Sequence, residues 1–160
     1  MKKLFCVLIL FVFLLPLACR YKDGPAINFH SVKNRLGGRW QVTGFTSDGV
    51  DSLQYYNDSC GCKMRIGFLS DENNIYFEEC PPNKYKYLGE GGGYFYFVDN
   101  KKKMNLFLVG KSPFKGLGPI AYGGSSGYNC EWEILKLTKD ELKISSDFNG
   151  RNYIISFKKE

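Results

Sequence analysis

Apolar and polar residues alternate along several short stretches of the chain, and this period of two is typical of half-buried β-strands. The clearest stretches are RWQVTGF (39–45), KMRIGFL (63–69), NIYFEE (74–79), ELKIS (141–145) and NYIISFK (152–158). In each of them every second residue is apolar, so one face is expected to pack inward and the other to meet water.

Clusters of Gly, Asn, Asp, Ser and Lys separate these stretches and are typical of tight turns between antiparallel neighbours. They are SDG (47–49), SDENN (70–74), DNKKK (99–103), TKD (138–140) and FNGRN (148–152). The pattern predicts an all-β, antiparallel up-and-down meander of about eight to ten strands, arranged as a sandwich or, more favourably, as a closed barrel without exposed strand edges.

Two segments carry helical rather than alternating patterns. The stretch FHSVKNRL (29–36) places its apolar residues on one helical face, and DSLQYYND (51–58) can be capped by Asp51 or Ser52. We therefore expect one or two short helices beside the strands.

Two further strands are apolar on both faces, which predicts that their outer faces are also covered. They are YFYFVD (94–99) and MNLFLVG (104–110). The candidates for the cover are the helix at 29–36 and the segment 111–129, which has no clear period but is too apolar for simple disorder. We expect the second segment to form an ordered flap.

The N-terminus has the layout of an export signal, with Lys2 and Lys3 followed by the apolar run LFCVLILFVFLLPLA (4–18). The run is shorter than the roughly 20 residues that a membrane-spanning helix needs. Because a small residue, Ala18, stands directly before Cys19, the stretch resembles the signal of bacterial lipoproteins.

That resemblance implies cleavage after residue 18 and lipid on Cys19, including amide-linked acyl chains such as palmitate. Several acyl chains would anchor the protein stably in one leaflet. The implied organisation is a signal peptide at 1–18, a lipidated tether at 19–28 and the barrel at 29–160, held at the bacterial cell envelope and most naturally at the outer membrane. The alternatives are a plain secretory signal or a buried thiol at Cys19.

Four cysteines remain after the signal and the anchor are set aside, and an even number in an exported chain predicts disulfides. A bridge within the CGC sequence would close a strained loop, so one cysteine of that pair is expected to meet each of the other two. A four-thiolate zinc site and a redox-active CGC are the alternatives, although the C-x-x-C spacing usual for zinc is missing. The four disulfide candidates are Cys60, Cys62, Cys80 and Cys130.

Charge and reactive groups argue against nucleic-acid binding and against catalysis. The formal charge is +6, from 22 basic and 16 acidic residues, and removal of Lys2 and Lys3 leaves 20 basic residues and a charge of +4. KKK (101–103) is expected to be a turn rather than a binding patch. The one histidine, His30, lies at the margin of the domain, and no metal, cofactor or phosphate-binding motif is predicted. Glu131 and Glu133 share one strand face that should point to water.

Both ends of the domain resemble lipocalin-like proteins. The sequence LGGRWQVTGFTSDG (36–49) carries Gly-x-Trp at the entry to the first strand, and WEILKLTKDELKISSDFNGRNYIISFKK (132–159) is similar to the last three strands of small bacterial lipocalin-like lipoproteins. The resemblance implies a lipocalin-like barrel in which Trp40 plugs the floor beneath a basic side chain of the last strand, either Lys158 or Arg151.

The high aromatic content, 16%, is compatible with a filled barrel or with a cavity for one apolar ligand. The sequence therefore leaves two non-enzymatic functions open: a monomeric binding module for a small apolar ligand or a peptide, and an accessory surface lipoprotein that acts through protein contact. For the first function the candidate lining residues are Tyr94, Phe95, Tyr96, Phe97, Phe107, Tyr122 and Tyr153.

Overall fold

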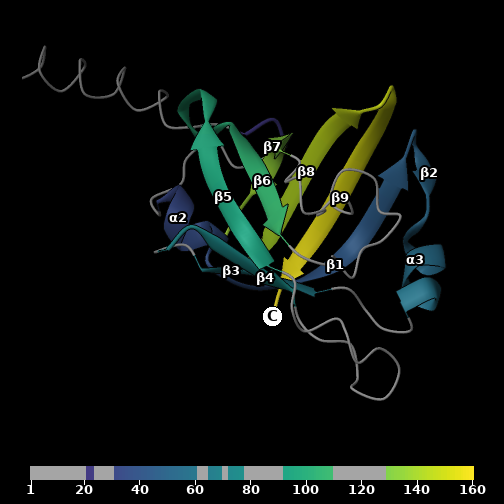
Figure 1. The fold of residues 1–160 in the computed structure, drawn as a ribbon, viewed down its shortest axis with the longest axis horizontal. Coiled ribbons are helices and arrows are strands. Elements are labelled where there is room, and N and C mark those ends of the chain that lie inside the picture. The colour runs from purple at the N-terminus through teal and green to yellow at the C-terminus, as the bar shows by residue number, and fades with distance from the viewer. Residues whose placement is uncertain (1–20, 24–30, 61–64, 70–71, 78–91, 110–128) are drawn as a thin grey trace, which may run out of the picture.

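The computed structural model describes residues 21–23, 31–60, 65–69, 72–77, 92–109 and 129–160, which fold mainly into antiparallel strands (Figure 1). The strands are β1 (Gly38–Ser47), β2 (Val50–Asp51), β3 (Arg65–Leu69), β4 (Asn74–Phe77), β5 (Gly92–Val98), β6 (Lys103–Val109), β7 (Asn129–Leu137), β8 (Glu141–Phe148) and β9 (Arg151–Lys159).

The sheet closes on itself because β1 pairs with two distant strands at once. Trp40 lies opposite Ile66 of β3 on one side and opposite Lys159 of β9 on the other. From β3 to β9 each strand pairs with the next along the chain, so β1 and β3–β9 make an eight-stranded barrel, and β2 extends β1 as a hairpin. The prediction of an all-β, antiparallel closed barrel is confirmed.

The interior of the barrel is filled by the apolar residues of the alternating pattern. Trp40 and Trp132 are both fully buried, as expected for large side chains that point to the centre of a small barrel. The other large side chains of the core are Phe45, Ile66, Phe68, Phe95, Met104, Ile134, Leu142 and Ile144.

Helix α2 (Val32–Leu36) closes one end of the barrel. The Ser31 hydroxyl caps it by accepting a hydrogen bond from the Asn34 N–H at 3.1 Å. The Trp40 indole N–H donates to the Leu36 carbonyl at 2.7 Å, which ties the helix to the first strand. Trp40 therefore lies at the floor, as the resemblance implies.

The basic side chain over Trp40 is Lys159, so the expectation of Lys158 or Arg151 was wrong. The ammonium nitrogen of Lys159 lies 5.1 Å from the centre of the Trp40 ring and donates to the Arg35 carbonyl at 3.0 Å. Strand alternation explains the difference, because Phe157 and Lys159 share the inward side of β9 while Lys158 faces water.

Gly38 is required beside this lysine. Its φ is +117°, which side chains rarely adopt, and a Cβ there would lie only 2.8 Å from Lys159 Cε. The glycine of the Gly-x-Trp sequence therefore makes room for the cation above the tryptophan.

The second helix, α3 (Leu53–Cys60), confirms the prediction for 51–58 to within two residues. The Asp51 carboxylate caps it by accepting from the Leu53 N–H at 2.9 Å. Among the helices that the structure describes, none is both long and apolar enough to cross a membrane.

Residues 21–23, which belong to the predicted tether at 19–28, are packed against the barrel. Tyr21 is only 3% exposed and belongs to the hydrophobic core. Its hydroxyl donates to the Lys101 carbonyl at 3.0 Å, and the Arg35 guanidinium lies 5.5 Å from the centre of its ring. Burial of the tyrosine ring and the hydrogen bond of its hydroxyl both stabilise the docked segment relative to a free linker.

Asp23 adds two polar contacts to the same docked segment. Its backbone N–H donates to the Leu135 carbonyl at 2.7 Å, and its carboxylate pairs with Lys143 at 2.9 Å. The pairing of β7 with β8 is irregular between Ile134 and Lys136, and this bulge leaves the Leu135 carbonyl free to accept the bond.

Candidate functional site

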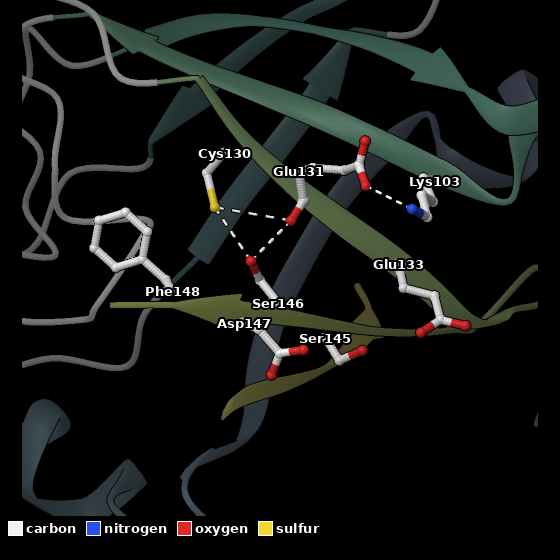
Figure 2. A pocket seen from close by; sticks show the side chains of 8 residues that line it. All are labelled: Lys103, Cys130, Glu131, Glu133, Ser145, Ser146, Asp147 and Phe148. Carbon is white, nitrogen blue, oxygen red and sulfur yellow. Dashed lines mark hydrogen bonds and ion pairs between the residues drawn. The ribbon is translucent and has the colours of Figure 1, made fainter. Parts of the chain in front are cut away.

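The candidate site lies where β7 and β8 separate. Their ladder runs from Leu137 opposite Leu142 to Glu133 opposite Ser145, and there it stops. Beyond that pair the two strands diverge, with the side chains of Cys130 and Ser146 between them (Figure 2). A wall of the barrel is therefore open at this point.

The opening forms a notch of about 330 Å³ with a polar lining. A volume of this size is at the lower end of the range for small-molecule pockets. Its lining comes from β6, β7 and β8 and consists of Lys103, Cys130, Glu131, Glu133, Ser145, Ser146, Asp147 and Phe148.

A chain of side-chain hydrogen bonds replaces the backbone ladder at the bottom of the notch. The Ser146 hydroxyl donates to the Glu131 carbonyl at 2.8 Å, and the Cys130 sulfur lies 3.2 Å from the same hydroxyl oxygen. Either group can be the donor in this contact between the thiol and the hydroxyl. Ser146 thus satisfies a carbonyl that would otherwise face the gap.

Burial raises the pKa of the Cys130 thiol above its ordinary value, and the hydrogen bond with Ser146 offsets part of this rise. The nearby Glu131 carboxylate raises the pKa further. The thiol is therefore held in its protonated form, which is a poor nucleophile.

The rim of the notch is charged. Lys103 forms an ion pair with Glu131 at 2.6 Å, and this hydrogen-bonded carboxylate raises the pKa of Lys103. Glu133 and Asp147 add two more carboxylates, so the rim carries an excess of negative charge. Glu131 and Glu133 both face outward, as predicted from the alternation of β7.

The outer surface of the barrel continues from the notch across β6 to β5. Lys103, Asn105 and Phe107 of β6 alternate outward, and across β5 they face Val98, Tyr96 and Tyr94. Tyr94 stacks on Phe107 with ring centres 4.6 Å apart. The exposed or half-buried residues on the outer side of these strands form a surface that we call the β5–β8 face; they are Tyr94, Tyr96, Phe107, Glu131, Glu133 and Asp147.

This arrangement overturns part of the predicted ligand lining. Tyr94 and Tyr96 are 44% and 41% exposed and flank the buried Phe95, so they lie outside the barrel, and Phe107 stacks on Tyr94 on that same side. The predicted cover of the outer faces is therefore incomplete over 94–99, whereas Asn105 on the outer side of β6 is buried. Strand alternation permits only every second residue of β5 to enter the core.

The other predicted lining residues point inward and pack on one another. Phe95 makes edge-to-face contacts with Phe68 at 5.5 Å and with Phe97 at 5.7 Å, and Tyr153 lies 6.1 Å from Phe45, all as distances between ring centres. These residues belong to the hydrophobic core of the barrel or pack against it. Tyr122 and the predicted flap at 111–129, apart from residue 129, lie outside the described residues.

The predicted disulfides stay a prediction. Cys130 is a buried free thiol in the structure, and no disulfide joins the residues that the structure describes. Cys62 and Cys80 lie outside the described residues, as does the side chain of Cys60, so the pairing of CGC with the other two cysteines is untested.

Within the described ranges, no three His, Cys, Asp or Glu side chains gather as metal ligands would. His30, Glu78 and Glu79 lie outside these ranges. The residues that sequence reasoning missed are Ser146 and Asp147. A signal for Ser146 was present, because a serine at an inward position of a strand needs a hydrogen-bond partner.

No protein-family model matches this chain, and no curated protein is significantly similar to it in sequence. The barrel is therefore established by the structure alone, and the resemblance to lipocalin-like lipoproteins stays a prediction from the residues quoted above.

Proposed function

We propose that this protein is a lipid-anchored, lipocalin-like barrel of the bacterial envelope that binds a polypeptide partner through the β5–β8 face, without catalysis. The observation that carries the proposal is the exposure of two neighbouring tyrosines, Tyr94 and Tyr96, beside an acidic notch. An exposed aromatic patch next to charged groups is a common mark of protein interaction sites.

The two parts of the face suit different parts of a partner. Tyrosine rings supply large contact area at a low cost in side-chain entropy, and their faces attract cations. The carboxylates of Glu133 and Asp147 attract the same cations. A segment that presents arginine or lysine beside an apolar side chain matches this combination.

The filled interior supports binding at the outside rather than within the barrel. An apolar ligand of ordinary size needs a cavity of several hundred cubic ångströms. The described part of the interior is instead occupied by Trp132, Phe95, Met104 and their neighbours. The predicted function as a carrier of an apolar ligand is therefore the less supported of the two.

The state of Cys130 supports a non-catalytic role. A nucleophilic cysteine needs a depressed pKa and a neighbouring base. Here the pKa is raised, and the partners of the thiol are a hydroxyl and a backbone carbonyl. The polar groups of the notch are thus arranged to hold the wall together and to offer hydrogen bonds.

The test uses cells that express the lipidated protein, with cross-linking before purification. Tyr94→Ser combined with Tyr96→Ser, and separately Glu133→Gln combined with Asp147→Asn, should each reduce recovery of the cross-linked partner. The matched control is Tyr55→Ser, because Tyr55 is 70% exposed on α3, away from this face. Equal recovery from all variants would reject the β5–β8 face as the binding site.

A second candidate function is binding of a small polar molecule in the notch, which its volume of about 330 Å³ supports. Native mass spectrometry of the protein purified from its own cells would reveal a bound molecule. If that molecule is lost in Ser146→Leu, which fills the bottom of the notch, this second function is favoured over protein contact.

A further inference from the structure

The docked segment 21–23 fixes which end of the barrel lies near the N-terminal anchor. The Tyr21 hydroxyl contacts the turn between β5 and β6 at Lys101, and its ring lies beside Arg35 of α2. Figure 1 shows α2 on the left and the β1–β2 and β8–β9 turns on the right, at the opposite end of the barrel. The segment therefore binds at the end closed by α2, here called the α2 end.

Very little chain separates this docked segment from the proposed lipid. Cys19 precedes Tyr21 by two residues, and two fully extended residues span at most about 7 Å. If Cys19 carries acyl chains that enter a bilayer, the α2 end must lie against the headgroups. A barrel held by so short a connection cannot turn its other end to the membrane.

The charges of the two ends differ in the direction that this orientation requires. Helix α2, the turns at its end of the barrel and the docked segment carry the exposed cations Lys22, Lys33, Lys101, Lys102 and Lys139, against Asp23, Glu72, Asp99 and Asp140. The described part of the opposite end carries Asp48, Asp51, Asp58 and Asp147, against Arg151. The α2 end is thus the more positive of the two.

The β5–β6 turn presents its lysines in an unusual backbone conformation. Asp99, Asn100 and Lys101 all have positive φ, at 48°, 52° and 67°. Three consecutive left-handed residues without glycine are costly, by roughly 1–2 kcal/mol each. The Tyr21 hydroxyl donates to the Lys101 carbonyl of this turn, so the docked segment also holds the lysines in place.

We propose that the α2 end is the membrane-facing surface of the protein and that Lys22, Lys101, Lys102 and Lys139 contact the phosphates of anionic phospholipid headgroups. This inference rests on the lipid anchor at Cys19 that the proposed function contains. Each lysine near an anionic surface raises the affinity for the membrane by about fivefold. The orientation leaves the notch, at the start of β7 and the end of β8, directed away from the bilayer and open to a partner.

The test reconstitutes the mature lipidated protein into two sets of vesicles, phosphatidylcholine alone and phosphatidylcholine mixed with phosphatidylglycerol. A water-soluble reagent then acetylates exposed lysines, and mass spectrometry measures the modification at each position. Lys101 and Lys102 should be several-fold less reactive in the anionic vesicles. High salt should restore their reactivity, because it screens the attraction.

Variants separate headgroup contact from simple crowding. Lys101→Gln combined with Lys102→Gln should weaken the contact by about fivefold for each lysine, so that Lys22 and Lys139 become as reactive as in phosphatidylcholine. The matched control is Arg151→Gln, which removes an exposed cation at the opposite end and should leave the protection unchanged.

The outcomes distinguish the orientation from the anchor. Equal labelling of Lys101 and Lys102 in both vesicle types, with the protein still floating with the vesicles, would overturn the orientation and leave the anchor intact. A mature protein whose Cys19 carries no acyl mass would overturn the anchor and the orientation together.

Discussion

Replacement of Tyr21 tests whether the first residues after the anchor are truly part of the barrel. Tyr21→Ala removes the ring of a residue that is only 3% exposed, and it deletes the contacts with Lys101 and Arg35. Removal of a buried aromatic side chain costs about 3–5 kcal/mol in general. Because a terminal segment can detach, we expect the lower figure, about 3 kcal/mol.

Tyr21→Phe separates the hydroxyl from the ring. It keeps the buried ring and the contact with Arg35 but leaves the Lys101 carbonyl without its donor at 3.0 Å. One such hydrogen bond contributes about 1 kcal/mol to the free energy of unfolding. The two variants should therefore differ by about 2 kcal/mol, the share of the ring itself.

The assay is equilibrium unfolding of the mature Cys19→Ser chain in urea, with tryptophan fluorescence as the readout. Trp40 and Trp132 are both fully buried, so their emission reports the loss of the core. Tyr94→Phe is the control, because it alters a tyrosine on the outer surface and should change the free energy by less than about 0.5 kcal/mol. If Tyr21→Ala were as stable as the control, the segment would not be docked, and the orientation inferred from it would fail.

Gly38→Ala should lower the free energy of unfolding in urea by about 1–3 kcal/mol, because the new Cβ would press on Lys159 at a strained φ. Gly49→Ala, also at positive φ but in open space, is its control, and equal losses would argue against the contact with Lys159. The hydrogen-bonded ion pair with Lys143 lowers the pKa of Asp23 below 3.8 in the folded protein. The unfolded chain therefore binds a proton at Asp23 more readily than the folded protein does. The ion pair stabilises the fold above pH 3.8, and this stabilisation is lost as the pH falls through the lowered folded pKa. Urea titrations of the wild type and of Asp23→Asn should therefore converge in acid, and a gap that persists there would contradict this assignment. Cys130 should be alkylated many-fold more slowly in the folded protein than in urea, as timed mass spectrometry would show; equal rates would mean that its thiol is not buried.

The fold was largely predictable because its information is local. Period-two alternation fixes which residues of each strand face inward, and turn-forming residues fix where strands end. At Asp48 and Gly49, and again at Asn149 and Gly150, positive φ values occur at the predicted turns. The helix caps at Ser31 and Asp51 are local in the same way.

The candidate site was not predictable, because it depends on where pairing stops. No residue pattern in β7 or β8 predicts that their backbone pairing ends at Glu133 and Ser145. The sequence also could not predict which of Tyr94 and Phe95 points into the core, because both residues are aromatic and β5 is apolar on both faces.

The sequence by itself determined the strands, their turns, the position of Trp40 at the entry of the first strand and the expectation of an anchor at Cys19. Only the tertiary structure decided that Tyr21 is buried and that Lys159 covers Trp40, because both contacts join segments at least 80 residues apart in the chain. Contacts between distant segments depend on how the barrel closes. They also depend on which groups remain to be buried or hydrogen-bonded after closure, and the local sequence determines neither.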